Sequence, residues 1–213
     1  MMETCRLIVI GTSMGGLTAL EEVLSRLPEN FQTPVVVVLH RSVDSTGGLV
    51  QLLRRHSRVR VKEPLDKEPI LPGHVYIAPP DYHLMVDESS FALSTDAPEL
   101  YARPSIDVLF ETAAEAYGAG VVAVVMTGAS SDGARGAAKV KAAGGMVIVQ
   151  NPQTAESPLM PQAALRATAT DRVLDLAEIG SCLSDICEYG TSSDGGKQPP
   201  PGATAALGAR PGE

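Results

Sequence analysis

What is scarce or missing in this 213-residue chain excludes several broad classes of protein. No apolar run approaches the ~20 residues that a membrane-spanning helix needs, and residues 1–6 lack the charged-then-apolar layout of a secretion signal. The formal charge is −8, and no cluster of Lys and Arg offers a binding surface for phosphates. The sequence therefore predicts a cytoplasmic protein that neither inserts into a membrane nor binds nucleic acid.

Cysteine is also scarce. Cys5, Cys182 and Cys187 are an odd number of thiols without Cys-x-x-Cys spacing. This pattern indicates neither a disulfide framework nor a zinc site, so we expect buried free thiols and no metal. No cofactor is predicted either.

The content that is present suffices for one sizeable domain. Hydrophobic residues make up 44 % of the chain, and a single domain of this size is common. From Gly190 onwards the composition changes to Gly, Pro, Ser and Ala without periodicity. We expect one domain over residues 1–189 and a disordered tail over residues 190–213.

Apolar runs alternate with helical patterns along this domain. Strands are expected at residues 5–10, 34–39, 59–62, 74–78, 121–126, 146–150 and 172–174. Helices are expected at residues 15–27, 46–56, 104–117, 132–143, 161–167 and 177–189. Residues 83–86 and 91–94 form an expected antiparallel hairpin. This order predicts an α/β fold, a three-layer αβα sandwich with a mostly parallel, doubly wound sheet.

The most informative segment is the connection between the first strand and the first helix, Gly-Thr-Ser-Met-Gly-Gly at residues 11–16. Glycines on both sides of Ser13 allow a tight turn that exposes its hydroxyl at the carboxyl end of the strand. Helix-opening amides beside it could stabilise an oxyanion. Two other interpretations stay open at this point, a turn that only packs strand against helix and a loop that cradles a phosphate.

A nucleophilic serine needs a base and an orienting carboxylate, and the ends of two other strands supply candidates. His40 directly follows the buried run at residues 35–39, whereas His83 in the expected hairpin is a second choice. Asp132 follows the buried run at residues 121–126. An aspartate there could cap the helix that follows, orient an imidazole, or do both.

Two further histidines have simpler interpretations. His56 ends an amphipathic helix, where a positive charge is favourable, and His74 begins a strand at the opposite edge of the sheet from His40. Three strand ends thus bring Ser13, His40 and Asp132 to one edge of one sheet. Their order along the chain differs from the Ser, Asp, His order of the α/β-hydrolases.

These residues lie within segments that resemble the catalytic domain of the chemotaxis protein-glutamate methylesterase family, the CheB type. The matching segments are IVIGTSMGG at 8–16, VVLH at 37–40, PGHVYIAPP at 72–80, RPSIDVLF at 103–110 and MTGASSDGA at 126–134. The resemblance implies hydrolysis of γ-glutamyl methyl esters on chemoreceptors, and in some members deamidation of receptor glutamines. It implies Ser13 as nucleophile, His40 as base and Asp132 as the residue that orients His40. The backbone amides of Met14 and Ala129 would form the oxyanion hole.

The chain departs from the family pattern in three places. Met14 stands where the family commonly has threonine, and residues 41–43 are Arg-Ser-Val where it often has Met-Pro. The N-terminal receiver domain of the chemotaxis enzymes is not found before the first strand, so we expect a receiver-free form. Such a form implies a different methylated protein as a candidate substrate and a separate regulatory protein as a candidate partner.

Two alternative functions remain open from the sequence. The glycine-rich loop partly mimics that of a Rossmann or flavodoxin-like nucleotide-binding module, although Ser13 replaces its second glycine and His40 replaces the expected acidic residue. A non-catalytic binding scaffold that kept the fold is the other alternative.

Overall fold

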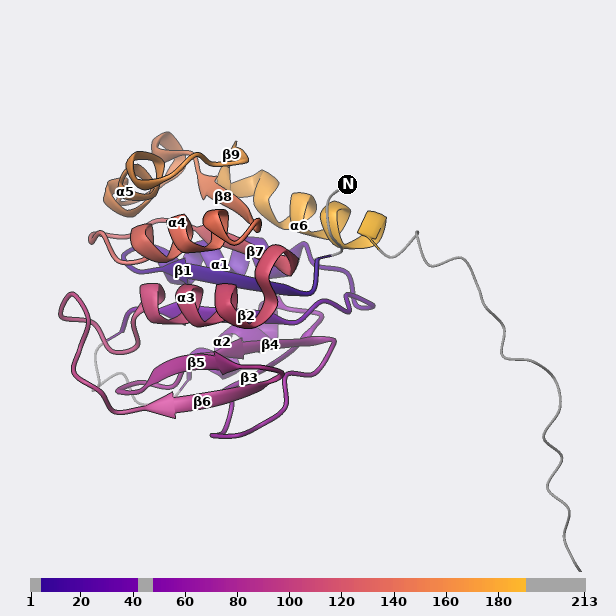
Figure 1. Cartoon of the computed structure of the whole chain (residues 1–213). Coiled ribbons are helices and arrows are strands. Elements are labelled where there is room, and N and C mark those ends of the chain that lie inside the picture. Colours follow the sequence, from indigo (N-terminus) through magenta and orange to yellow (C-terminus); the bar gives the residue numbers. More distant parts are fainter. Residues whose placement is uncertain (1–4, 42–47, 191–213) are drawn as a thin grey trace, which may run out of the picture.

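A computed structural model describes residues 5–41 and 48–190. These residues form a seven-stranded parallel sheet and the elements packed around it (Figure 1). The strand order is β3-β4-β2-β1-β7-β8-β9. The strands are β1 Leu7–Thr12, β2 Val35–Leu39, β3 Arg60–Lys62, β4 His74–Ile77, β7 Val121–Val125, β8 Met146–Gln150 and β9 Arg172–Leu174. Because β1 pairs with both β2 and β7, it occupies the centre of the sheet.

Helices cover both faces of the sheet. One face carries α1 Gly16–Ser25, α2 Leu49–His56 and α6 Leu176–Gly190, and the other carries α3 Ile106–Tyr117, α4 Ala134–Ala142 and α5 Leu159–Ala167. The short helices η1 Gly118–Gly120 and η2 Pro152–Thr154 lie in connections. None of the helices in the described ranges combines the length and apolar character required to cross a bilayer.

An antiparallel hairpin packs outside the main sheet. Its strands, β5 His83–Asp87 and β6 Ser90–Ser94, form a separate two-stranded sheet against α3. Leu84 and Phe91 from the hairpin join the same apolar cluster as Phe110 of α3. The hairpin therefore extends the helical layer on that face.

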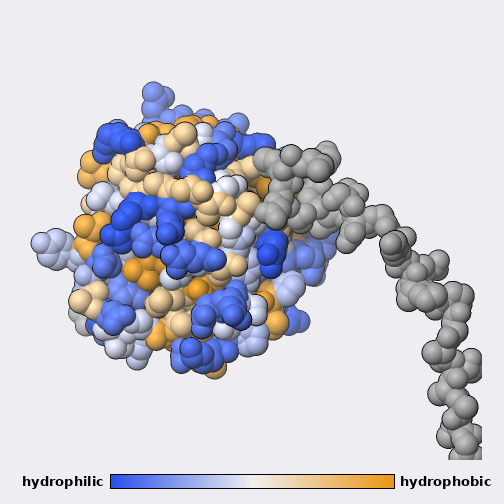
Figure 2. All heavy atoms as spheres, viewed as in Figure 1, coloured by the Kyte–Doolittle hydropathy of each residue, from blue (hydrophilic) through white to orange (hydrophobic). Residues whose placement is uncertain are grey.

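The central strand explains why the apolar runs in the sequence are continuous. Ile8 and Ile10 contribute to the core beneath α1 and α6, whereas Leu7 and Val9 contribute to the core beneath α3 and α4. A strand covered on both faces is a nearly continuous apolar run, because side chains of both orientations are buried. The predicted three-layer α/β fold is confirmed. On the face of the molecule in Figure 2, hydrophilic and apolar side chains are interspersed.

Element boundaries differ from the predictions by a few residues. The helix expected from residue 132 begins at Ala134, because Gly133 adopts a left-handed conformation with φ 94° and ends the preceding turn. The helix expected from residue 161 begins at Leu159, and the first strand is shifted to Leu7–Thr12. The tail predicted for residues 190–213 begins one residue too early, because Gly190 ends α6. Residues 191–213 and the expected helix start at residues 46–47 lie outside the described residues.

Candidate active site

The site lies at the carboxyl ends of three neighbouring strands. Ser13 follows β1, His40 follows β2, and Asp132 lies in the connection from β7 to α4. The chain leaves β1 for β2 on one side, while β7 and the later strands lie on the other side. Ligand sites in doubly wound sheets form at such a switch point, outside the carboxyl ends of the strands.

His40 and Asp132 are joined by a hydrogen bond across the sheet end. Nε2 of His40 lies 2.8 Å from Oδ2 of Asp132, whose side chain is completely buried. The His40 side chain is 15 % exposed, so one edge of the ring reaches solvent. Since Nε2 donates to the carboxylate, Nδ1 is the ring nitrogen left with a free lone pair.

Ser13 and His40 line one cleft of about 570 Å³. Among the described residues the Ser13 hydroxyl makes no hydrogen bond, so its oxygen is free to meet a substrate or the imidazole. Ala129 lines the same cleft. Within residues 5–41 and 48–190 the amides of Met14 and Ala129 donate to no protein acceptor, which leaves both available for an anionic oxygen.

Asp132 is held by the start of α3 as well as by His40. It accepts hydrogen bonds from the amides of Ile106 at 2.7 Å and Asp107 at 2.9 Å, and from the hydroxyl of Ser105 at 3.0 Å. Burial favours a raised pKa for Asp132, but the hydrogen bonds from His40 and these amides outweigh it and lower the pKa. The carboxylate is thereby kept ionised.

The helix that Asp132 caps is not the one that the sequence indicates. Asp132 caps α3, whereas α4, which follows it in sequence, has Gly133 at its N-cap and receives no side-chain bond from Asp132. The amides of Gly133 and Gly136 instead donate to Oδ1 of Asp107 at 2.9 and 2.7 Å. The start of α3 is therefore capped by Asp132, from the turn that leads into α4. The start of α4 is capped in return by Asp107 of α3.

Asp107 sits close to a second negative charge. Burial, reinforced by the charge of Asp132, raises the pKa of Asp107 to about 6. The Arg135 Nε lies 3.8 Å from its Oδ2 and provides partial compensation. The two carboxylates therefore have opposite shifts, with Asp132 the stronger acid.

Thr127 links the loop after β7 both to the loop after β1 and to Ser157 in the connection before α5, and neither residue stands out in the sequence. The Thr127 hydroxyl donates to the carbonyl of Met14 at 2.8 Å and accepts from the amide of Ser157 at 2.9 Å. At Gly128 an added Cβ would lie 2.9 Å from Cβ of Ser13 and 1.9 Å from Sδ of Met160. A side chain at that position would push against the serine, so the close approach of the two loops requires glycine.

The glycines that flank Ser13 have different roles. Gly15 has a φ of 74°, as expected for a tight turn before α1. Gly11 lies inside β1, and an added Cβ there would meet Ile106 at 2.2 Å. The expectation that both glycines bend the turn is therefore wrong for Gly11, which is needed for the packing of α3.

The remaining histidines take structural positions. The ring of His83 is buried, and its nitrogens meet the carbonyl of Ala97 at 3.1 Å and the amide of Ser105 at 3.2 Å. His74 begins β4 and bonds to Pro72 at 2.8 Å. With both nitrogens occupied, His83 has no lone pair to offer a nucleophile.

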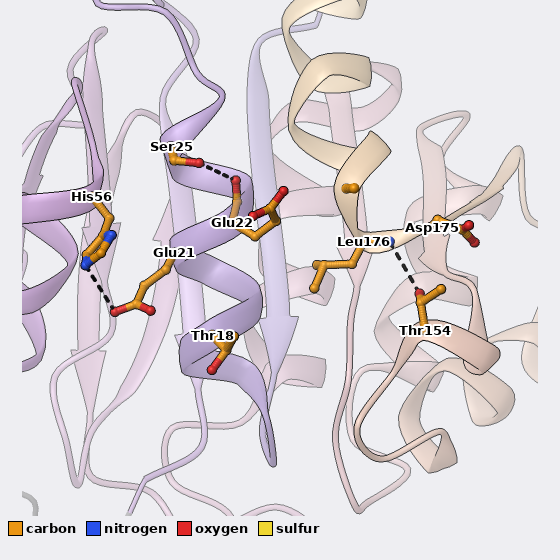
Figure 3. Close-up of a pocket in the computed structure, with 9 residues that line it drawn as sticks. Thr18, Glu21, Glu22, Ser25, His56, Thr154, Asp175 and Leu176 are labelled. Atoms are coloured by element: carbon orange, nitrogen blue, oxygen red, sulfur yellow. Dashed lines mark hydrogen bonds and ion pairs between the residues drawn. The ribbon is translucent and has the colours of Figure 1, made fainter.

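A second hollow, of about 530 Å³, lies between α1 and the start of α6 (Figure 3). His56 of α2 and Glu21 of α1 approach each other at one side of it, with Nε2 3.6 Å from the carboxylate. Glu22 and Asp175 also line it, and it shares no lining residue with the Ser13 cleft. Within the parts of the chain that the structure describes, no group of three or more His, Cys, Asp or Glu side chains is placed to hold a metal ion.

A doubly wound sheet with serine, histidine and aspartate at its switch point is the layout of an α/β hydrolytic enzyme. Residues 8–183 match the family model described as CheB methylesterase. The chain belongs to this family, whose curated members bear the names of carboxylic ester hydrolases.

Individual relatives are similar over most of the chain. A protein of Leptospira interrogans, named as a putative protein-glutamate methylesterase/protein-glutamine glutaminase, is 45 % identical over 81 % of this chain and 90 % of its own. A Myxococcus xanthus protein of the corresponding name is 38 % identical over 83 % of this chain and 50 % of its own. The crystal structure of the Thermotoga maritima CheB methylesterase catalytic domain matches with a TM-score of 0.82 and 36 % identity, covering 86 % of this chain and 99 % of that one.

Proposed function

We propose that the chain hydrolyses γ-glutamyl methyl esters on a methylated chemoreceptor or another methylated protein. Ser13 is the nucleophile, His40 the general base, and Asp132 the residue that orients His40. The observation that carries this proposal is the 2.8 Å hydrogen bond from His40 to a buried carboxylate, beside a cleft that Ser13 also lines. Family membership and the names of the relatives support the reaction class.

The reaction begins when the Ser13 oxygen attacks the ester carbonyl and Nδ1 of His40 takes the hydroxyl proton. The imidazolium that forms is stabilised by Asp132 through Nε2–H. The amides of Met14 and Ala129 stabilise the negative oxygen of the tetrahedral intermediate. When the intermediate collapses, His40 returns the proton to the methoxy group and methanol departs.

Water then completes the cycle. His40 removes a proton from a water molecule that attacks the glutamyl ester of Ser13, and the second intermediate releases glutamate and restores the serine. A glutamine side chain can follow the same course with ammonia as the leaving group. The glutaminase activity in the names of the relatives fits this chemistry, and we propose it as a second reaction of the same site.

A serine-directed probe tests the proposal directly. A fluorophosphonate should react with the native chain at Ser13, as identified by peptide mass spectrometry, and should abolish methanol release from a glutamyl methyl ester in proportion to the labelling. Heat-denatured protein is the control and should remain unlabelled. An esterase that is fully active after complete modification of Ser13 would show that another group performs the reaction.

Changing Asp132 to Asn tests the orienting carboxylate. One oxygen is replaced by an NH₂ group that can donate to Nε2 of His40, which stabilises the wrong tautomer and moves the ring proton to Nδ1. We expect kcat to fall by up to ~10⁴-fold, equivalent to about 5.5 kcal/mol of transition-state stabilisation. The loss of an acceptor for the Ile106 amide should also lower stability by about 1–3 kcal/mol, measured by urea unfolding.

Ser105→Ala is the matched control for Asp132→Asn. Ser105 donates to the same carboxylate and accepts from the amide of Val108, but it does not contact His40. Its loss should cost about 1 kcal/mol of stability, typical of a helix cap. The control should lose less than ~10-fold in kcat, because His40 keeps its carboxylate acceptor. A loss of that size corresponds to less than about 1.4 kcal/mol of transition-state stabilisation. Equal activity losses in the two variants would contradict the role of Asp132.

A further inference from the structure

The connection from β6 to α3 contains a tight turn that borders the catalytic cleft. Glu99 and Ala102 exchange two backbone hydrogen bonds, of 3.1 and 2.8 Å, so Leu100 and Tyr101 are the two central residues. Figure 1 shows this connection projecting at the edge of the molecule where the parallel strands end. Leu100 and Tyr101 both line the cleft that holds Ser13.

The turn has an unfavourable sequence for its conformation. Leu100 and Tyr101 have φ values of 47° and 65°, in the left-handed region that bulky residues rarely occupy. Two-residue turns of this kind favour Asn-Gly. Burial does not compensate the strain, since Leu100 is 51 % exposed and Tyr101 is fully exposed. For folding alone, Asn-Gly at these two positions would therefore be more favourable than Leu-Tyr.

The turn is nevertheless firmly anchored at its base. The guanidinium of Arg103 donates to the carbonyls of Thr95 at 2.8 Å and Asp96 at 3.0 Å. The buried ring of His83 bonds to the carbonyl of Ala97 at 3.1 Å. A turn fixed in this way holds Leu100 and Tyr101 in place before any partner arrives, which lowers the entropic cost of binding.

The arginines that line the cleft are already paired with carboxylates of the same chain, and apolar side chains lie beside them. Arg103 is paired with Asp81, and Arg41 is paired with Glu63 at 2.6 Å. Met14, which follows the nucleophile, is 54 % exposed and adds another apolar side chain. A partner that approaches Ser13 therefore meets charges that are already compensated and apolar side chains that are not covered.

The position of the cleft favours a helix over an added strand as the bound segment. Strand addition requires a free sheet edge, and the edges of this sheet are β3 and β9. The cleft lies at the ends of β1 and β2 in the centre. A surface helix can lower one side chain into such a cleft while its neighbours three and four residues away touch the rim.

We propose that the Leu100–Tyr101 turn is a substrate-docking element that selects apolar residues one helical turn from the methylated glutamate. This inference rests on the proposed function. The partner is an amphipathic helix of the protein substrate, with the ester and its apolar neighbours on one face. Tyrosine suits this role because it offers a large contact area and loses little conformational freedom on binding.

Two helical peptides test the selection. Both carry one γ-glutamyl methyl ester, and they differ only in having leucine or serine at the positions four before and three after it. The parent should show a kcat/KM about 10-fold higher for the leucine peptide. With Leu100→Asn and Tyr101→Gly combined, that preference should fall below about twofold, while the melting temperature should equal or exceed that of the parent.

Leu65→Asn is the control, because Leu65 is 70 % exposed and does not line the cleft. This variant should keep the 10-fold preference. Retention of the preference by the Asn-Gly variant, or a parent that hydrolyses both peptides equally, would overturn the role of the turn and leave the proposed function standing. Failure of the parent to hydrolyse either peptide or any small glutamyl methyl ester would overturn the proposed function itself.

Discussion

Replacing Ser13 with alanine is expected to lower kcat for ester hydrolysis by as much as about 10⁶-fold. That loss corresponds to about 8 kcal/mol of transition-state stabilisation, because the covalent route disappears and only substrate binding and the oxyanion donors remain. The folded state should hardly change. The Ser13 hydroxyl makes no hydrogen bond to a described residue, and its backbone amide bond to Thr127 survives the substitution.

The measurement is methanol release under saturating substrate, with thermal unfolding of the same preparations. Ser130→Ala provides the matched control, because Ser130 lines the same cleft and its hydroxyl, among the described residues, hydrogen-bonds only to the backbone amide of Asp132, at 3.2 Å. It should retain activity within about tenfold of the parent. Hydrolysis by Ser13→Ala at the parental rate would exclude the covalent mechanism.

The second large effect is expected at His40. His40→Ala should reduce kcat nearly as much as the loss of Ser13, because members of a triad act as a unit. His40→Gln is the sharper variant, since its amide NH₂ can replace Nε2–H as donor to Asp132 while providing no base. We expect His40→Gln to approach parental stability and to be as inactive as His40→Ala, as measured by melting temperature and initial rates.

His83→Ala distinguishes the two candidate bases. The bonds that His83 makes to Ala97 and Ser105 are structural, so this variant should lose about 1–3 kcal/mol of stability and less than ~10-fold in activity per folded molecule. Added imidazole should restore part of the activity of His40→Ala, because the ring of His40 borders the open cleft. A crippled His83→Ala beside an active His40→Ala would reverse the assignment.

Much of the fold could be predicted because the parallel sheet is covered on both sides. The strands around Val9, Val37 and Val124 are buried at every position and almost entirely apolar, and the helices between them have clear apolar faces. Polar residues in the connections that follow three such strands are natural candidates for a site. The sequence could therefore indicate Ser13, His40 and Asp132 without any knowledge of their distances.

The missing parts depend on contacts between distant segments. Nothing near Asp132 in the sequence indicates that it accepts from the amides of Ile106 and Asp107, about 25 positions earlier. The sequence pattern also does not predict the Leu100–Tyr101 turn, because turn prediction relies on Asn and Gly, and neither residue is present there. The local sequence pattern thus indicates where the strands end. The hydrogen bonds that hold the site residues in place form between segments that only tertiary packing brings together.

The exchange of caps between α3 and α4 makes the alignment of His40 inseparable from the docking of these helices. Asp132 bonds to His40 and holds the first turn of α3 at the same time, and Asp107 holds α4 in return. A force or a bound molecule that separates the two helices would remove the hydrogen bonds that fix this carboxylate beside the imidazole. We therefore expect hydrolysis to be sensitive to changes at the contact between α3 and α4, even where the cleft itself stays unobstructed.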